Sequence, residues 1–270
     1  KLDDKLIKLK ISKDDVEKVE EIFNDKESTI NPYYFQYKAH QLDVKINGDV
    51  FNLELSKYGI ILIKNASLDQ AIEIVRKRVD EVGTNEPNIL KRGNDRILLE
   101  LPGLDNPDRI KSLLGKTADL AFKLESRGSN ESFGTEKLKL IETGEELFLS
   151  KRVIISGENL VDASPRMDTL NSQTVVSFTL DRVGSKRFAQ ATKRNIGTRL
   201  AIVLDGQIIS APVIRDVIAG GSGQISGGFT FQSATDLALL LRSGALPAPL
   251  NVIEERTVGP DLGQDSINAG

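Results

Sequence analysis

The sequence predicts an α+β fold, and three observations carry this prediction. Residues 65–125 alternate helical and strand patterns in short succession, which is typical of helices packed on one face of a largely antiparallel sheet, as in the ferredoxin-like plan. Residues 126–205 contain short strands separated by polar, glycine-containing loops, a texture that indicates a strand-rich insertion. Residues 1–64 combine one helix with one hairpin and are expected to form a small α/β subdomain.

Within the N-terminal subdomain, one helix signal and one hairpin signal are clear. Ser12 is followed three residues later by Asp15, a spacing that favours a helix start. The apolar residues that would share one face of this helix are Val16, Val19, Ile22 and Phe23. The segments "QLDVKI" and "DVFNLEL" alternate as strands do, and Asn47 with Gly48 between them favours the two positive φ angles of a tight hairpin turn.

The next predicted helix has the most complete set of boundary signals. Ser67 and Gln70 form a capping box at its start, and Gly83 supplies the left-handed residue that ends it. Its apolar stripe consists of Leu68, Ala71, Ile72, Val75, Val79 and Val82. The opposite face carries the charged residues Arg76, Lys77 and Asp80. A solvated helix face explains these charges better than a binding patch does.

The middle of the chain continues this alternation. After the strand "RILLELPG", Asn106 is predicted to cap a helix with Pro107 in its first turn and Gly115 at its end, and the strand "ADLAFKLE" follows. In the insertion, the strands "LFLSKRVIIS" and "TVVSFTL" flank a predicted loop, "DASPRMDTLNSQ". A further helix near "GSKRFAQATKRN" is expected to stop at Gly197.

The last third of the chain is punctuated by glycine and proline. The run "RLAIVLDGQIISAPVI" is predicted to turn at its Asp-Gly pair and to break at Pro212. The cluster "AGGSGQISGG" has the spacing of neither a dinucleotide nor a phosphate loop, so a plain turn explains it better than an anion site. A helix with the residues "LLLRS" is capped by Gly244, and a strand-like run follows from Leu250.

Composition argues against several classes of function. The net charge of -3, from 36 basic and 39 acidic residues, leaves no surplus of cations for a nucleic acid, and it does not indicate an anionic membrane surface either. Cysteine is absent, which excludes thiol nucleophiles and thiolate zinc sites. The one histidine, His40, has no partner at metal or triad spacing and is interpreted as a strand residue at or near the surface.

Acidic pairs do not change this interpretation. Glu145 and Glu146, like Glu254 and Glu255, are neighbours in extended segments, so their side chains would point to opposite faces and cannot line one catalytic cleft. The chain is therefore not expected to be an enzyme, and no catalytic residue, cofactor or metal site is expected.

The first residues of the sequence predict that the chain begins within a longer protein. The chain has no run of about 18 apolar residues that would span a bilayer. Its first residues, "KLDDKLIKLKIS", lack the apolar core of a signal peptide, so the chain is expected to begin within a longer protein. The final segment "EERTVGPDLGQDSI" follows the last predicted strand and has no further element to join.

Four segments carry a resemblance to a known family. They are "LDQAIEIVRKRVDEVGTNEPNILKRGNDRILLELPGL", "LGKTADLAFKL", "GGFTFQSATDLALLLRSGALPAPL" and "VIEERTVGPDLGQDSI". In this order they closely resemble the SecD family, membrane subunits of the bacterial Sec protein-export machinery. The resemblance covers most of residues 68–270.

The resemblance implies an architecture. A ferredoxin-like base would consist of residues 65–125 and 206–256, with residues 126–205 inserted as a mobile head. Residues 257–270 would lead into a transmembrane helix outside this chain. The full-length protein would be embedded in the plasma (inner) membrane, with this domain on its outer side, which is the periplasm of a Gram-negative cell.

The resemblance also implies a function. The domain would bind emerging unfolded polypeptides and assist the completion of export that depends on the proton-motive force. Its partners would be a SecF-like subunit and the Sec channel. The alternative is a structural scaffold that holds other Sec subunits without binding client chains.

Four residues are candidates for this role. Phe133 and Met167 are predicted to lie in loops and are candidates for client contact, although packing into the core of the head is the favoured alternative. Gly128 and Gly206 lie near the two chain crossings between base and head, so they are predicted to be hinges.

Overall fold

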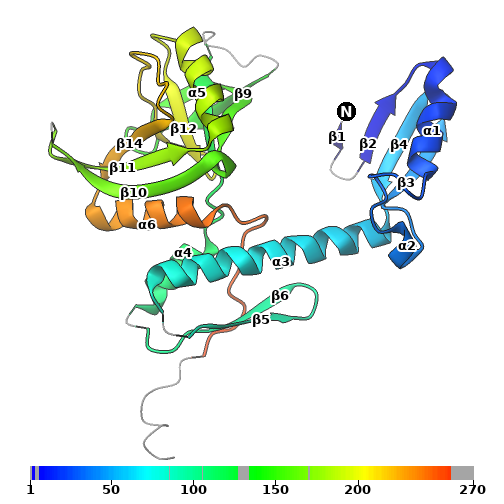
Figure 1. Ribbon diagram of the computed structural model, residues 1–270, viewed down its shortest axis with the longest axis horizontal. Coiled ribbons are helices and arrows are strands. Elements are labelled where there is room, and N and C mark those ends of the chain that lie inside the picture. Colours follow the sequence, from blue (N-terminus) through cyan, green and yellow to red (C-terminus); the bar gives the residue numbers. More distant parts are fainter. Residues whose placement is uncertain are drawn as a thin grey trace, which may run out of the picture. The chain divides into compact units, whose positions relative to one another are not determined.

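A computed structural model describes residues 2–3, 6–84, 86–104, 106–126, 134–169 and 171–256 (Figure 1). The chain separates into two compact units, and each is described by itself. The N-terminal unit comprises Lys1–Ile72 and Ile89–Leu99, and the main unit comprises Glu73–Asn88 and Glu100–Gly270. Helices and antiparallel strand pairs occur in both units, so the fold is a mixture of helices and sheets, as predicted.

The N-terminal unit is built on a four-stranded antiparallel sheet of order β1-β2-β4-β3. Its strands are β1 (Leu2–Asp3), β2 (Leu6–Lys10), β3 (Leu42–Asn47) and β4 (Val50–Leu55). The other elements are η1 (Lys13–Asp15), α1 (Val16–Asn24), α2 (Tyr34–Tyr37), the first part of α3 (Lys57–Val82) and most of the hairpin β5 (Asn88–Arg92) and β6 (Arg96–Glu100). Phe23 of α1 packs on Phe51 of β4, with ring centroids 6.2 Å apart, so this residue of the predicted apolar face is directed to the sheet. Ile22, which was predicted to share that face, is 51% exposed.

The hairpin between β3 and β4 turns one residue later than predicted. Asn47 pairs with Val50 in the ladder, so the two loop residues are Gly48 and Asp49. Only Gly48 has a positive φ, at 64°, as in a turn whose first central residue is glycine. Asn47 stays in the strand because this turn needs a single left-handed residue.

Helix α3 begins at Lys57, well before the predicted start at Ser67. The residue that caps it is Ser56, whose Oγ accepts a hydrogen bond from the Gly59 N–H at 3.0 Å and donates one to the main-chain oxygen of His40 at 2.6 Å. The apolar run after this cap continues directly into the predicted stripe. Ser67 therefore lies inside a helix that is already formed, where a serine is tolerated.

The second half of α3 agrees with the sequence pattern. Leu68, Ala71, Val75 and Val79 of the predicted stripe are buried. Arg76, Lys77 and Asp80 are exposed, which confirms the solvated face. Gly83, with φ at 80°, follows the last helical residue. One stripe position was missed, because the fully buried Arg78 lies between Val75 and Val79.

The main unit contains a five-stranded sheet of order β13-β12-β7-β9-β8. Its strands are β7 (Leu120–Glu125), β8 (Thr135–Lys139), β9 (Glu146–Ser156), β12 (Leu200–Leu204) and β13 (Gln207–Ser210). The two edge strands meet, because Leu140 after β8 forms a bridge with Ile208 of β13 and the Ile141 N–H donates to the Ile208 oxygen at 2.9 Å. The buried side chains gathered here are Leu140, Leu147, Leu149, Ala201, Val203 and Ile208.

A three-stranded antiparallel sheet of order β10-β11-β14 borders the largest core of the main unit. Its strands are β10 (Leu160–Asp168), β11 (Gln173–Leu180) and β14 (Ser222–Phe229). The helices of this unit are the second part of α3, α4 (Pro107–Gly115), α5 (Arg182–Arg194), α6 (Phe231–Ser243) and the single turn η2 (Gly157–Asn159). Helix α6 runs along β10 and β11 (Figure 1). The rings of Phe122, Phe178 and Phe188 meet inside, so strands of both sheets and α5 share one core.

Several predicted boundaries in this unit are confirmed. Asn106 caps α4, because its Oδ1 accepts a hydrogen bond from the Arg109 N–H at 3.0 Å. Asp205 and Gly206 form the turn between β12 and β13 with φ angles of 50° and 78°, the two positive values that an Asp-Gly pair favours. Gly244, with φ at 89°, follows the last residue of α6.

Two predicted elements are wrong. The segment "DASPRMDTLNSQ", predicted as a loop, belongs to strand β10 as far as Asp168, because its residues pair one by one with β11. Pro165 fits there because β10 is an edge strand, where a missing N–H is tolerated. Residues 250–256, predicted as a strand, pair with no strand of the described chain, and their Val252 and Ile253 are exposed.

The sheets do not follow the predicted boundaries after residues 125 and 205. Strand β7 of the predicted base lies between β9 and β12 of the predicted head, and the β12–β13 turn contains residue 205 itself. Sequence texture reveals where composition changes, whereas strand neighbours depend on which segments meet in space. A ferredoxin-like base stays a prediction.

Candidate functional site

Strand β10 is the edge of the three-stranded sheet, and its register decides which side chains it presents. Ala163 lies opposite Phe178, and Met167 lies opposite Thr174. Alternate residues share one face of a sheet, so Ala163, Pro165 and Met167 are on the same face. Ala163 is buried in the core on this face, whereas Met167 near the end of the strand is 64% exposed.

The backbone edge of β10 is largely closed to a further strand. The guanidinium Nη1 of Arg242 donates a hydrogen bond to the main-chain oxygen of Ala163. Because backbone groups of an antiparallel strand point alternately to either side, those of Ala163, Pro165 and Met167 point away from β11. Pro165 has no N–H, so of these three residues Met167 is the one that keeps both a backbone donor and a backbone acceptor on this side.

A small apolar surface lies where this edge ends. The last residues of β10 and the first turn of α6 lie at the same end of their layer (Figure 1). Met167 comes next to last in β10 and Phe231 is the first residue of α6, and the side chain of each is 64% exposed. We call these two residues the β10–α6 surface. The expected packing of Met167 into the core is therefore wrong.

The other three candidate residues from the sequence are not part of the β10–α6 surface. Phe133 and Gly128 lie outside the described residues. Gly206 lies in a tight turn whose two strands belong to one sheet. The Asp205 carboxylate holds this turn by accepting hydrogen bonds from the Thr117 hydroxyl at 2.6 Å and the Asp119 N–H at 2.8 Å. Gly206 thus lies in a turn within one sheet, and its role as a hinge stays a prediction.

The glycine cluster has a packing role that neither sequence interpretation included. Residues 222–228 of the cluster belong to strand β14, and Gly220 and Gly221 before them lie in a bend. A Cβ on Gly223 would meet the Phe178 ring at 2.6 Å, and one on Gly227 would meet the Ile209 oxygen at 2.9 Å. These glycines let a strand approach neighbouring groups closely.

A buried arginine joins three helices of the main unit. Arg78 of α3 donates hydrogen bonds to the main-chain oxygens of Leu113 at 2.8 Å, of Thr117 at 3.3 Å and of Gly244 at 3.2 Å, and to the Ser243 hydroxyl at 3.3 Å. Its acceptors are carbonyls at the C-terminal ends of α4 and α6, where the partial charge is negative. Burial lowers the pKa of Arg78 to about 10, so it remains charged at neutral pH.

Two ion pairs add to the contacts between α3, α4 and α6. Arg242 of α6 contacts the Glu81 carboxylate of α3, with an Nη2–Oε2 distance of 2.6 Å, and this hydrogen bond holds the pKa of Glu81 below its usual range. Arg109 of α4 contacts Asp236 of α6, with an Nη2–Oδ1 distance of 2.7 Å. Helix α6 is therefore fixed at both its middle and its C-terminal end.

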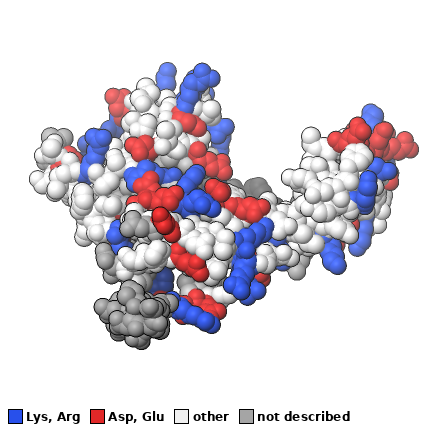
Figure 2. All heavy atoms as spheres, turned by 60° about the horizontal axis from the view of Figure 1, so that its bottom comes forward, with Lys and Arg blue, Asp and Glu red and all other residues white. Residues whose placement is uncertain are grey.

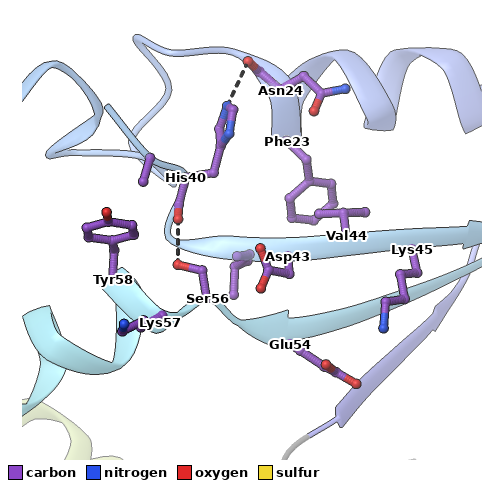
Figure 3. A pocket seen from close by; sticks show the side chains of 12 residues that line it. Phe23, Asn24, His40, Asp43, Val44, Lys45, Glu54, Ser56, Lys57 and Tyr58 are labelled. Atoms are coloured by element: carbon purple, nitrogen blue, oxygen red, sulfur yellow. Dashed lines mark hydrogen bonds between the residues drawn. The ribbon is translucent and has the colours of Figure 1, made fainter. Parts of the chain in front are cut away.

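A hollow in the N-terminal unit is lined by His40 and its neighbours (Figure 3). Figure 3 shows the imidazole of His40 directed toward the main-chain oxygen of Asn24, at 3.3 Å. The Ser56 hydroxyl donates to the main-chain oxygen of His40 and not to its ring, so no serine–histidine pair forms here. His40 is half-buried and lies two residues before the start of β3, which corrects its predicted position in a strand.

Several charged side chains elsewhere pair with opposite charges. Glu145 contacts Arg199 and Glu146 contacts Lys137, so these neighbours point to different partners, as expected. On the visible face of the main unit, basic and acidic side chains are interspersed (Figure 2). Among the described residues, no group of three or more metal-ligating side chains is found.

Comparison with known proteins provides the context for these features. A family model described as "SecDF, P1 head subdomain" matches residues 133–248, and one described as "Protein translocase subunit SecDF, P1 domain, N-terminal" matches residues 68–127. A solved structure described as "Structure and function of a membrane component SecDF that enhances protein export" is 34% identical, with a TM-score of 0.61, and the match covers 94% of that chain and 72% of this one. This chain belongs to the SecD family.

Curated SecD relatives agree with this assignment. "Protein translocase subunit SecD" of Rickettsia conorii is 44% identical over 244 residues, and that of Acetobacter pasteurianus is 46% identical over 224 residues. The matches cover 85% and 81% of this chain but 46% and 43% of the relatives, so the chain spans less than half of their length. These SecD proteins are named as translocase subunits, a transport role and not an enzymatic one, as expected.

A second solved SecDF structure, described as "Crystal structure of SecDF in Super-membrane-facing form", is 36% identical with a TM-score of 0.63 over 76% of this chain. The SecDF head model extends to residue 248, past the head boundary predicted at 205. It thereby includes β12, β13, β14 and α6, which share sheets or a core with the predicted head. Within the described residues, no helix has the length and apolar character needed to cross a membrane.

Proposed function

We propose that this domain binds unfolded polypeptides during protein export, and that it does so through the β10–α6 surface. The observation that carries the proposal is the exposure of Met167 and Phe231 at one end of a firmly held layer. Methionine is flexible and polarizable, and phenylalanine offers a large apolar ring, so the pair suits clients of many sequences. Contact would be made by side chains, because Pro165 and Arg242 obstruct strand addition along β10.

The wider role follows from the family. We place the domain on the outer, periplasmic side of the plasma membrane, with a SecF-like subunit and the Sec channel as partners and with export that depends on the proton-motive force. Movement of a head relative to a ferredoxin-like base, with Gly128 and Gly206 as hinges, belongs to the same proposal. The fixed turn around Gly206 makes Gly128 the stronger of the two hinge candidates.

The chain contains a single methionine, and this makes a direct test possible. Labelling the methionine methyl group with carbon-13 gives one NMR signal, which reports on Met167 alone. We expect this signal to shift when an unfolded, export-type polypeptide is added, and to remain unchanged with the same polypeptide folded. Replacing Phe231 by serine should weaken the interaction about tenfold, because an exposed ring contributes about 1.4 kcal/mol when a client covers it.

Val183 provides the matched control, because it is an exposed apolar residue at the start of another helix, α5, in the same unit. The variant V183S should leave the titration unchanged. No shift of the Met167 signal at about millimolar polypeptide, a concentration comparable to that produced by tethering at a channel exit, would contradict client binding at this surface. That outcome would favour the alternative, a scaffold that holds other Sec subunits.

A further inference from the structure

Three tyrosines form an exposed cluster on the N-terminal unit. Tyr33 and Tyr37 flank one turn of α2, with ring centroids 6.5 Å apart, and Tyr37 lies 6.5 Å from Tyr58 in the first turn of α3. Ile61 follows Tyr58 at the three-residue spacing that places two side chains on one side of a helix. All four side chains are more than a third exposed. We call these four residues the tyrosine patch.

The helix beside the tyrosine patch is apolar but uncovered. Ile60 and Ile63 of α3 are each 43% exposed, so this part of the helix presents apolar side chains in several directions. A helix that is apolar on several sides normally packs in a protein core or in a membrane. The first turns of α3 therefore require a partner with an extended apolar surface.

Positive charge flanks the same segment. Lys57 and Lys64 are exposed and lie four and three residues from Ile61, so the three side chains follow one side of α3. Among the described residues, neither lysine has a carboxylate within ion-pair distance. Acidic side chains gather instead at another end of this unit, over α1 (the upper right of Figure 2).

We propose that the tyrosine patch lies in the headgroup region of a lipid bilayer that contains anionic lipids. Tyrosine has an apolar ring and a polar tip, so it is enriched at membrane interfaces, and lysines beside it attract anionic headgroups. The net charge of -3 did not indicate a membrane contact. It sums over the whole chain, so the acidic residues around α1 cancel the positive charge beside the tyrosine patch. A related SecDF is described as a membrane component, which makes a bilayer a surface within reach.

This contact is independent of client binding, which we assign to the main unit. A bilayer accounts for both parts of this surface, because tyrosines suit the headgroup region and lysines without an ion-pair partner are attracted to anionic lipids. A general polypeptide binder relies instead on a flexible, adaptable surface. Its effect would be to give the N-terminal unit a defined orientation at the membrane surface, with the acidic region around α1 directed away from anionic lipids.

The absence of tryptophan permits a sharp test with the whole chain. The variant Y33W places one tryptophan in the tyrosine patch, and I22W places one on the exposed side of α1, with similar exposure. Both are titrated with vesicles of phosphatidylcholine containing about one quarter phosphatidylglycerol, and with the same vesicles carrying brominated acyl chains. We expect the emission of Y33W to shift to shorter wavelength and to be quenched by bromine, and that of I22W to remain unchanged.

Charge variants test the role of the lysines. In the Y33W background, Lys57→Gln and Lys64→Gln should each weaken vesicle binding about fivefold, because one lysine near an anionic surface contributes about 1 kcal/mol. The control Lys8→Gln, on strand β2, should have no effect. Circular dichroism of each variant verifies that the unit is folded.

Two outcomes would overturn the proposal. One is an unchanged Y33W spectrum up to about 1 mM lipid, a concentration well above the dissociation constant of a single acyl anchor. The other is an equal response of I22W, which would indicate adsorption without a specific face. A shift of Y33W with an unfolded polypeptide and none with vesicles would assign the patch to polypeptide binding instead.

Discussion

Arg78 of α3 donates a hydrogen bond to the main-chain oxygen of Leu113 in α4, at 2.8 Å, with the arginine side chain fully buried. The same guanidinium reaches the oxygen of Gly244 after α6. Among the described residues no carboxylate lies within ion-pair distance of this guanidinium, and carbonyl dipoles at two helix ends stabilise its charge in the interior. This single side chain determines how three helices meet.

Replacing Arg78 by methionine should destabilise the main unit by about 3 kcal/mol or more. The volume is nearly retained, but several buried carbonyl oxygens lose their donor, and each such loss costs about 1–3 kcal/mol. Arg78→Lys should be intermediate, because an ammonium group keeps the charge but reaches fewer of these acceptors. Urea unfolding measures the free energies.

Arg76 provides the control, because it lies in the same helix on the exposed face. R76M should change the unfolding free energy by less than about 0.5 kcal/mol. Equal stability of R78M and R76M would show that the hydrogen bonds of Arg78 contribute no net stability.

Gly223→Ala should destabilise the main unit by about 1–3 kcal/mol, because the added methyl group would overlap the buried ring of Phe178. Gly220, three residues earlier, has open space where a Cβ would be placed and does not have a positive φ. Gly220→Ala should therefore be neutral or slightly stabilising. Thermal unfolding of the two variants distinguishes packing in β14 from a simple requirement for glycine flexibility, which would affect both.

The Glu81–Arg242 pair should make stability depend on pH in the acid range. Its hydrogen bond lowers the pKa of Glu81 in the folded state, so its contribution is present above the ordinary glutamate pKa of about 4.3 and is lost as the pH falls through the lowered value. Glu81→Gln should reduce the loss of stability on acidification in this range. Glu73→Gln, at an exposed position of the same helix, serves as the control, and an unchanged acid profile of E81Q would contradict the prediction.

Gly206→Ala distinguishes a turn from a hinge. With φ at 78°, an alanine there is strained by about 1–2 kcal/mol, so the variant should unfold at lower urea concentration. A turn residue should affect stability only, and the Met167 signal should respond to unfolded polypeptide as in the unaltered chain. Loss of that response in a folded variant would instead support the hinge.

Local signals in the sequence succeeded where one residue determines the backbone. Asn106 as a cap, the Asp205–Gly206 turn and Gly244 after α6 were all predictable, because each depends on the chemistry of one or two side chains. The predicted start of α3 was wrong for a related reason. Ser56 and Ser67 are both suitable cap residues, and the feature that distinguishes Ser56 is its tertiary hydrogen bond to the His40 oxygen.

The main features of the site were not predictable to the same extent. Met167 was singled out as a candidate, but its edge position depends on the pairing of β10 with β11, which no local pattern specifies. Phe231 was missed, because a phenylalanine at a helix start normally indicates core. The burial of Arg78 could have been suspected, because it occupies a position among the apolar residues of α3. Its hydrogen-bond acceptors could not, because they come from segments far along the chain.

The bridge between Leu140 and Ile208 limits the order in which this sheet can form during synthesis. Strand β7 obtains one neighbour from β9 and the other from β12, and the sheet closes only when β13 reaches the end of β8. The ribosome synthesises the chain from its N-terminus. The first strands of this sheet therefore remain incompletely paired until the residues after Ile208 have left the ribosome. Until then the free edge of β7 is available to other chains, so aggregation during synthesis should begin at this edge.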